Sequence, residues 1–318
     1  CGSEGPDART PRPVTGLDTV REMGVGYGFA CARREDGSVW CWGDNDHGQL
    51  GVEGDDRVQA MPVPGVSNVA QLAVGAFHVC VRLETGRVSC WGSNSQGVLR
   101  APESVENRAA PGPIRGIANA TQLWSGAYHA CALDNRGRLK CWGASAHAQS
   151  GTRRRTRRAP PTRVRGIGDI AEISLGDGQS CARTTGGQMQ CWGQNLYGAE
   201  EGVASFYSTP MTLPELSDVQ SISVRSENQC AVAGGRVYCW GVNRMHQLHV
   251  PTTEAGQIVI HPSAVPGVSD ATEVALGWFA QCLRHTSGRW SCWGRNQNGA
   301  TGVGSNASMI ETPQPLPW

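Results

Sequence analysis

The sequence predicts an all-β fold, a six-bladed β-propeller built from four-stranded antiparallel blades. Three observations lead to this prediction. A cysteine, about nine residues and then Cys-Trp-Gly recur six times at intervals of about 50 residues, a period typical of circular or stacked repeats. Each repeat holds four short strand-like segments separated by turns, which is the content of one propeller blade. Glycine supplies 42 of the 318 residues, as expected of a β-protein with many turns.

The second repeat shows the order of the expected strands most clearly. It begins with a proline-containing strand at 62–66, which is followed by an apolar strand at 69–75. The first cysteine strand, 77–83, and the Cys-Trp-Gly strand, 87–92, complete the unit, and a variable loop leads to the next repeat. Continuous apolar runs in these strands indicate that both faces of a blade are covered by its neighbours.

Each pair of cysteines flanks the turn of a predicted β-hairpin. In five repeats the three residues midway between the cysteines end in glycine, as in Glu35–Gly37. Glycine at this position suits a three-residue loop, because it adopts a positive φ without a steric cost. The pair Cys230 and Cys239 is one residue closer, and Gly234–Gly235 at its centre suits a two-residue turn. Both turn types place the cysteines opposite each other at a non-hydrogen-bonded position, where side chains approach most closely.

We predict six disulfides, one within each hairpin. Cross-strand Cβ atoms at such positions lie about 4.5 to 5.5 Å apart, close to the separation that a disulfide needs. Buried free thiols are one alternative. Zinc is a weaker one, because the pairs lie on separate hairpins without clustered ligands. Six disulfides would place the chain in an oxidising compartment. The predicted pairs are Cys31–Cys41, Cys80–Cys90, Cys131–Cys141, Cys181–Cys191, Cys230–Cys239 and Cys282–Cys292.

The thirteenth cysteine is Cys1. The residues after it are polar and contain proline and glycine, so we expect a tether over 1–13 and the propeller over 14–318. This beginning resembles a mature bacterial lipoprotein, which would carry its lipid on Cys1; an arbitrary start of the sequence would give the same residue. The sequence contains no run of about 18 apolar residues, so no membrane span is predicted. The resemblance implies export and attachment to the outer membrane or cell surface by the lipid alone, with the periplasmic side as the alternative.

Composition and motifs exclude several function classes. The formal net charge is +1, which gives no reason to expect a nucleic acid partner. His246, His249 and His261 fall in one long connection, but no carboxylate or cysteine completes a ligand set, so we predict no metal and no cofactor. No arrangement of catalytic residues can be singled out, and we predict that the protein is not an enzyme. A hydrolase or lyase on a six-bladed propeller is the remaining alternative.

The segment Trp40–Gly51 resembles the signature of the regulator of chromosome condensation repeat propellers nearly throughout. The resemblance covers about residues 11–318 and becomes degenerate after the first repeat. That family usually has seven blades, whereas six repeats occur here, so six blades are predicted and seven are less favoured. The Asn-x-x-Gly part of the signature is kept at 94–97, 195–198 and 296–299 and lost at 145–148 and 243–246.

Two terminal segments, Thr10–Val14 and Thr312–Leu316, are copies of the same proline-containing strand. Six blades require one copy fewer. We expect the segments to meet at the ends of the repeat array, with one of them completing the last blade and protecting its edge. The sequence leaves open which copy pairs.

The tryptophan of each Cys-Trp-Gly is predicted to pack between blades. A large aromatic side chain at one fixed strand position in every repeat is typical of packing, and a ring of ligand-binding aromatics is the less favoured interpretation. These residues are Trp42, Trp91, Trp142, Trp192, Trp240 and Trp293.

Function in repeat folds is carried by loops, so the variable positions are the candidates for binding. The turn before the first cysteine strand carries aromatic residues in several repeats, and in the resembled family this turn opens on one face near the axis. An exposed aromatic patch would anchor a partner. The alternative is that these side chains fill the central channel. The candidates are Tyr27, Phe29, Phe77, Tyr128, Trp278 and Phe279.

A second candidate is an arginine cluster in the loop after the third Cys-Trp-Gly. Its positive field suits phosphate or carboxylate groups, whether of lipopolysaccharide, an anionic glycan, nucleic acid or an acidic protein. A solvated, mobile loop is the alternative. The residues are Arg153, Arg154, Arg155, Arg157 and Arg158.

Members of the resembled family include a guanine-nucleotide exchange factor on chromatin, a plant ultraviolet-B photoreceptor and a secreted β-lactamase inhibitor. The first needs a nuclear GTPase, which an oxidised, exported chain would not meet. The second uses clustered tryptophans, of which Trp278 is the one counterpart, and the third shows that an exported propeller can be a pure protein binder. We therefore predict a non-enzymatic binding scaffold, at the cell surface or in the periplasm, that contacts an unknown protein or an anionic glycan through its loops. A structural subunit of a self-assembling envelope complex is the alternative, and oligomer formation is left open.

Overall fold

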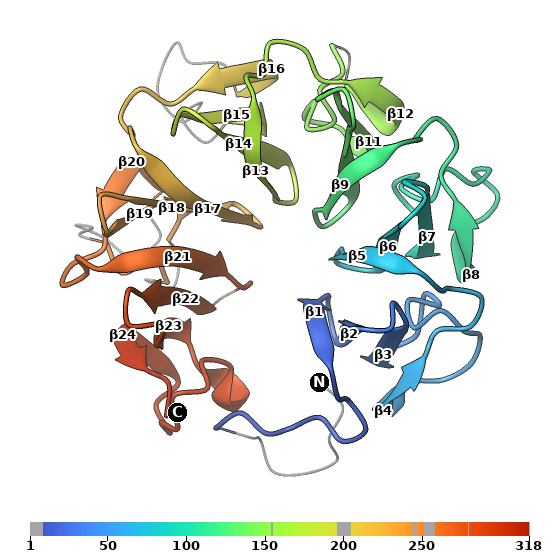
Figure 1. The fold of residues 1–318 in the computed structure, drawn as a ribbon. Helices are drawn as coiled ribbons and strands as arrows, with labels where there is room; N and C mark the ends of the chain where they lie inside the picture. The colour runs from blue at the N-terminus through green and yellow to red at the C-terminus, as the bar shows by residue number, and fades with distance from the viewer. Residues whose placement is uncertain are drawn as a thin grey trace. The chain divides into compact units, whose positions relative to one another are not determined.

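The computed structural model describes residues 9–153, 155–195, 205–243, 247–250, 258–278 and 280–317. Their strands form six four-stranded antiparallel sheets, and the fold is an all-β, six-bladed β-propeller, as predicted (Figure 1). The chain divides into two compact units of three blades each. Of the described residues, 13–165 belong to unit 1, while 9–12 and 166–317 belong to unit 2.

Unit 1 contains the first three blades. The first consists of β1 (Val20–Val25), β2 (Phe29–Arg34), β3 (Val39–Gly43) and β4 (Arg57–Pro62). The second consists of β5 (Val69–Val74), β6 (His78–Leu83), β7 (Val88–Ser93) and β8 (Asn107–Pro113). The third consists of β9 (Ala120–Ser125), β10 (His129–Asp134), β11 (Leu139–Ser145) and β12 (Thr156–Arg163).

Unit 2 contains the other three blades and one short 3-10 helix, η2 (Gln297–Gly299). The fourth blade consists of β13 (Ile170–Leu175), β14 (Gln179–Thr184), β15 (Met189–Gln194) and β16 (Phe206–Thr212). The fifth consists of β17 (Val219–Arg225), β18 (Asn228–Ala233), β19 (Arg236–Val242) and β20 (Ile258–Ala264). The sixth consists of β21 (Ala271–Leu276), β22 (Ala280–His285), β23 (Trp290–Arg295) and β24 (Met309–Pro315).

The central hairpin of each blade has the geometry that the cysteine spacing predicts. Cys31 lies directly opposite Cys41, and the same register recurs in the other five blades. Six disulfides join the predicted pairs, with Cα–Cα distances of 4.0 to 4.2 Å. The third turn residue has a positive φ, +75° at Gly37, and both Gly234 (+56°) and Gly235 (+74°) do so in the two-residue turn.

The glycine after each repeated tryptophan is required by a close approach of the backbone. Gly92 has a φ of +99°, and a Cβ there would lie 2.5 Å from the carbonyl oxygen of Phe77. The register between the third and fourth strands shifts at the tryptophan in every blade. Bulges of this kind re-aim a side chain, and the six tryptophans are 0 to 5% exposed. Trp91 and Trp142 donate their indole N–H to carbonyl oxygens of the preceding blade, both at 2.9 Å.

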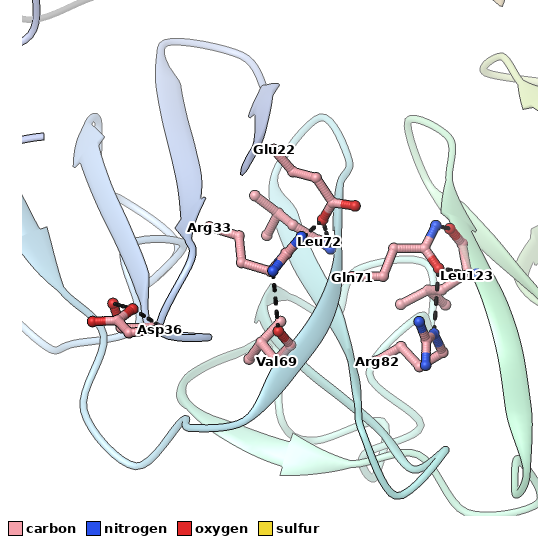
Figure 2. Close-up of polar contacts among 9 residues, drawn as sticks. Glu22, Arg33, Asp36, Val69, Gln71, Leu72, Arg82 and Leu123 are labelled. Atoms are coloured by element: carbon pink, nitrogen blue, oxygen red, sulfur yellow. Dashed lines mark hydrogen bonds and ion pairs between the residues drawn. The ribbon is translucent and has the colours of Figure 1, made fainter. Parts of the chain in front are cut away.

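A polar contact that the sequence did not predict links successive blades of unit 1 (Figure 2). Glu22 on β1 accepts the backbone N–H of Leu72 on β5 at 2.7 Å and the guanidinium Nε of Arg33 at 3.0 Å. Gln71 on β5 makes two bonds to Leu123 on β9, accepting its N–H at 2.9 Å and donating to its carbonyl at 2.8 Å. We call these contacts the inter-blade clamp.

The clamp recurs in unit 2 at the corresponding position of the fourth blade. Glu172 on β13 accepts the backbone N–H of Ile222 on β17 at 3.4 Å and the Nε of Arg183 at 3.0 Å. Burial raises the pKa of Glu172, although the bond from Arg183 and the N–H of Ile222 act in the opposite direction. A side-chain acceptor on the first strand is therefore a repeated means of joining blades.

The two copies of the proline-containing segment have different roles in unit 2. The C-terminal copy lies in β24, which pairs with β23 and completes the last blade. The N-terminal copy forms no strand; just before it, Arg9 accepts a bond from Gly304 N–H at 2.9 Å and donates to the carbonyl of Ser305 at 3.2 Å. Cys1 lies outside the described residues, so its lipid stays a prediction. Among the residues described, none of the helices has the length and apolar character needed to cross a membrane.

Candidate functional site

Three of the predicted aromatic residues lie in neighbouring turns of unit 1. Tyr27, Phe77 and Tyr128 each precede the second strand of their blade. Backbone hydrogen bonds join the three turns across the blades, from Tyr27 N–H to the carbonyl of Ala76 at 2.8 Å and from Ala76 N–H to that of Ala127 at 3.1 Å. The fold therefore aligns these turns.

Each of these turns is also fastened to the end of its own Cys-Trp-Gly strand. The carbonyl of Phe77 accepts the N–H of Ser93 at 2.8 Å, and the carbonyl of Tyr128 accepts that of Ala144 at 2.9 Å. These are the carbonyls that approach the repeated glycine, so the invariant strand end fixes the backbone from which the variable aromatic side chain projects.

The side chains form one row, which we call the aromatic row (Tyr27, His47, Phe77 and Tyr128). The ring centroids of Tyr27 and Phe77 are 5.4 Å apart, and those of Phe77 and Tyr128 are 6.2 Å apart with planes inclined by 27°. His47 meets Phe77 edge to face at 5.2 Å. Tyr27 is 58% exposed and the other three are partly exposed, so the row faces solvent.

The loop after β3 holds His47 in the row, and sequence analysis did not single this residue out. The side chain of Asn45 donates to the carbonyls of Val52 and Gly54 at 3.0 and 2.7 Å and accepts the N–H of Leu50 at 3.0 Å. The asparagine of the signature thus closes the loop. The sequence signal that could have found His47 is its place within the best-preserved copy of that signature.

Phe29 does not belong to the aromatic row, which corrects the prediction. It is fully buried at the start of β2 and packs in the core of unit 1 with Cys31 and Val79. Its ring lies beneath Gly26, where a Cβ would come within 2.0 Å of the Phe29 Cε1 atom. An aromatic residue two positions after Tyr27 therefore fills the interior rather than facing a partner.

The two aromatic candidates of the last repeat are in unit 2. Trp278 is partly exposed, and the guanidinium of Arg225 lies 4.9 Å from its ring centroid. This distance is typical of a cation–π contact. Phe279 lies outside the described residues.

A polar cleft of about 360 Å³ adjoins the aromatic row in unit 1. We define this polar cleft by His47, Glu103, Glu106, Arg157 and Arg158, which line it together with neutral polar residues. His47 belongs to both features, so the row and the cleft form one continuous surface. The two glutamates were not predicted, because isolated acidic residues in a variable loop carry no motif.

The predicted arginine cluster is divided between a loop and a strand. Arg157 and Arg158 lie in β12 rather than in the loop, because that strand begins at Thr156. Arg158 donates to the carbonyl of Asn94 at 2.5 Å and lies 3.7 Å from a carboxylate oxygen of Glu103, so it ties β12 to the second blade.

The remaining arginines of the cluster differ in accessibility. Arg157 is exposed in the cleft. Arg153 and Arg155 are exposed before β12, and Arg155 donates to the carbonyl of Ala146 at 2.5 Å. Arg154 lies outside the described residues. One accessible cation, Arg157, is therefore placed within the surface that also carries the aromatic row.

Acidic side chains lie in the same loop as His47. Burial, together with the neighbouring carboxylates of Asp56 and Asp46, raises the pKa of Asp44. These groups are not a metal site: in the described part of the chain no group of three or more histidine, cysteine or acidic side chains could hold an ion. The surface thus combines aromatic rings with carboxylates and the two arginines that line the cleft.

Comparisons with known proteins agree with the repeat analysis. A model of the regulator of chromosome condensation (RCC1) repeat matches residues 20–49, 69–98, 121–149 and 170–199, and a second model of that repeat matches residues 36–82. The chain is 25% identical to protein pim1 of Schizosaccharomyces pombe over 215 residues, which is 64% of this chain and 32% of that protein. The chain thus spans about a third of this relative.

Solved structures share the fold at low sequence identity. Prp20p from Saccharomyces cerevisiae superposes with a TM-score of 0.82 at 22% identity, covering 97% of this chain and 80% of that one. Human WBSCR16 superposes with a TM-score of 0.84 at 20% identity, covering 98% and 85%. Identities at this level establish similarity of fold.

Proposed function

We propose that this chain, which carries regulator of chromosome condensation repeats, is a non-enzymatic binding scaffold that holds a partner protein on the aromatic row and polar cleft of unit 1. The observation that carries the proposal is the continuity of the two features through His47. Three rings aligned by inter-blade hydrogen bonds provide rigid contact area, which lowers the conformational cost of binding.

The chemistry of the surface favours a protein over an anionic glycan. Tyrosine, phenylalanine and arginine are enriched where proteins bind one another. The cleft presents Glu103 and Glu106 beside Arg157, so a polyanion would meet repulsion as well as attraction. A protein segment with both charge signs and an apolar anchor matches the surface better.

Similar proteins support a protein as the class of partner, but they do not identify the partner of this chain. Prp20p has been characterised for its binding to Gsp1p and histones, which are proteins. Because the fold alone is shared at this identity, those partners are not carried over. What they support is that a propeller of this kind binds proteins.

The protein is expected to act in an extracellular or otherwise oxidising compartment. Six disulfides persist where thiols are not kept reduced. We place the scaffold at the cell surface or in the periplasm and retain a lipid on Cys1 as its anchor. Mass measurement of the protein isolated from its own membrane tests the anchor, because an acylated Cys1 adds the mass of fatty acids.

A comparison of captured proteins tests the binding proposal. The immobilised protein and a Tyr27→Ser, Phe77→Ser double variant are exposed to envelope extract of the organism that makes the chain. We expect at least one protein to be retained by the original surface and reduced at least tenfold by the variant. Met61→Ser is the control, because Met61 is an exposed apolar residue on β4 outside the row.

Equal capture by the original protein and the double variant would contradict the proposal. Light scattering of the purified protein at high concentration tests the alternative that the protein is a self-assembling subunit. A strict monomer excludes self-assembly, whereas assembly that survives the double variant would favour it over partner binding.

A further inference from the structure

The charge of the aromatic row and polar cleft indicates which kind of side chain a partner presents to them. Carboxylates outnumber guanidinium groups in the cleft and in the loop that carries His47. The carboxylates are those of Asp44, Asp46, Asp56, Glu103 and Glu106, and the guanidinium groups are those of Arg157 and Arg158. The surface is therefore complementary in charge to a basic segment of a partner.

Asp44 places one of these carboxylates against the aromatic row. Its N–H donates to the carbonyl of Gly28 at 3.0 Å, and Gly28 follows Tyr27 in the same turn. A Cβ at Gly28 would overlap Oδ2 of Asp44, so the carboxylate lies against that turn. Tyr27 is 58% exposed and Asp44 is partly exposed, so both can be reached from solvent. A negative charge and an aromatic ring thus adjoin at this end of the row.

Other carboxylates of the same loop crowd Asp44. Burial, and then the neighbouring Asp56 and Asp46, raise the pKa of Asp44. Oδ1 of Asp56 accepts the N–H of Asn45 at 2.8 Å, which holds that carboxylate close to the residue after Asp44. In the part of the chain that the structure describes, no lysine or arginine forms an ion pair with these three carboxylates. Their mutual repulsion costs free energy, which a cation supplied by a partner would relieve.

The arginines of the polar cleft do not supply that cation. Arg158 donates to the carbonyl of Asn94 at 2.5 Å and lies 3.7 Å from Glu103, so its guanidinium is engaged within the fold. Arg157 is exposed in the cleft together with Glu103 and Glu106. An acidic residue of the partner can meet Arg157, while the excess of carboxylates leaves the surface open to a basic one.

We propose that the partner presents an arginine side chain to the aromatic row beside Asp44, a step that rests on the proposed function. A guanidinium group is planar, stacks on an aromatic ring and donates two parallel hydrogen bonds to a carboxylate, whereas the ammonium of lysine is a more strongly hydrated point charge. The protein makes such a stack itself, where the guanidinium of Arg34 lies 5.3 Å from the ring centroid of Trp40. The partner's guanidinium stacks on Tyr27 and pairs with Asp44.

Saturation-transfer NMR with synthetic peptides tests the proposal on the unaltered protein. The probe is Ser-Gly-Arg-Gly-Arg-Gly-Ser, and two comparison peptides carry citrulline or lysine in place of both arginines. Citrulline keeps the planar shape of arginine and removes its charge. We expect transfer to the arginine side-chain protons, with a dissociation constant on the order of 1 mM. The citrulline peptide should bind at least about fivefold more weakly and the lysine peptide at least about twofold more weakly.

Variants of the loop carboxylates locate the binding site. The double variant Asp44→Asn, Asp46→Asn removes two charges and keeps the shape of both side chains. We expect it to weaken binding of the arginine peptide at least about fivefold at roughly 0.15 M salt. Glu53→Gln, Asp55→Asn is the matched control, because it removes two charges from exposed residues of the same loop that do not act on Asp44. The control should change the affinity less than about twofold.

The outcomes separate this proposal from the proposed function. Capture of the partner that falls in the Tyr27→Ser, Phe77→Ser variant but not in the Asp44→Asn, Asp46→Asn variant would keep the partner surface and overturn the arginine. Absence of transfer to the arginine peptide, or equal binding of the citrulline or lysine peptide, would also overturn it. Equal capture by the aromatic variant would instead contradict the proposed function. The peptide comparison needs no variant, so it decides even where a variant does not fold.

Discussion

At the scale of single residues, two histidines occupy the buried start of the second strand in neighbouring blades of unit 1. His78 is 2% exposed and lies 2.7 Å from the hydroxyl of Ser125, and His129 is fully buried. Burial lowers the pKa of His78 to about 4. Burial and the nearby His78 lower the pKa of His129 to about 3. Both rings are therefore neutral beneath the aromatic row at neutral pH.

These pKa values predict how the stability of the protein depends on pH. Because the unfolded histidine has a pKa of about 6.5, the folded state is favoured fully above that pH. The free energy of unfolding decreases as the pH falls from about 6.5 towards the pKa of the folded state. Between these two pH values the unfolded chain binds protons that the folded chain does not bind. Each histidine contributes a slope of about 1.4 kcal/mol per pH unit.

His129→Gln tests this slope with a residue that the fold already accepts, since Gln179 occupies the corresponding place at the start of β14. Urea unfolding of both proteins between pH 7 and pH 4 measures the free energy of unfolding. We expect the variant to lose less stability on acidification, by about 1.4 kcal/mol per pH unit. Parallel pH profiles for the two proteins would show that His129 is not neutral in the fold.

A single residue could be predicted where the neighbouring residues in the chain determine its conformation. The turn glycine at residue 37 could be predicted because the cysteine spacing fixes the loop length. Phe29 could not, because its burial depends on a glycine three residues earlier and on packing against the second blade. His47 was missed because its position in the row is set by a loop that Asn45 closes.

At the scale of strands and blades, the inter-blade clamp is the contact that sequence reasoning did not reveal. The acceptor is Glu22 in one blade and Gln71 in the next, so the residue type varies while the position is constant. A charged residue in an inner strand is ordinarily read as solvent-facing. Its actual partner is the backbone of a strand about 50 residues later, which no local pattern records.

The clamp predicts an effect on stability that surface residues would not have. Gln71→Leu leaves the N–H and carbonyl of Leu123 without their partner, and we expect a loss of roughly 2 to 4 kcal/mol in the free energy of unfolding. Gln122→Leu is the matched control, because Gln122 holds the same position on β9 and is exposed. It should change stability by less than about 0.5 kcal/mol.

Denaturant unfolding of the two variants measures this difference. Similar losses for Gln71→Leu and Gln122→Leu would mean that the clamp adds nothing to the contact between blades. Three strands of each blade were predictable from the repeat, whereas the strand expected over 62–66 as the first of the second repeat is β4, which ends at Pro62 and completes the first blade. The start of β12 was not, because Arg157 and Arg158 read as a charged loop and become strand residues by pairing with β11.

At the scale of the whole molecule, the 50-residue period was sufficient for the fold class and the number of blades. It did not decide which proline-containing segment completes the last blade, because both copies have the same local sequence preference; β24 is the C-terminal copy. The candidate surfaces lay beyond prediction for a different reason. The aromatic row and the polar cleft join residues from three blades, and only the register of those blades brings them together.

The proposed partner surface is tested most directly by photo-crosslinking in the organism that makes the protein. A photoreactive p-benzoylphenylalanine replaces Phe77 in the aromatic row, and a second protein carries it at Met61 on β4. We expect a discrete protein adduct after irradiation of the Phe77 variant and none for the Met61 variant. No adduct at Phe77, or the same adduct at both positions, would contradict the claim that the aromatic row holds a partner.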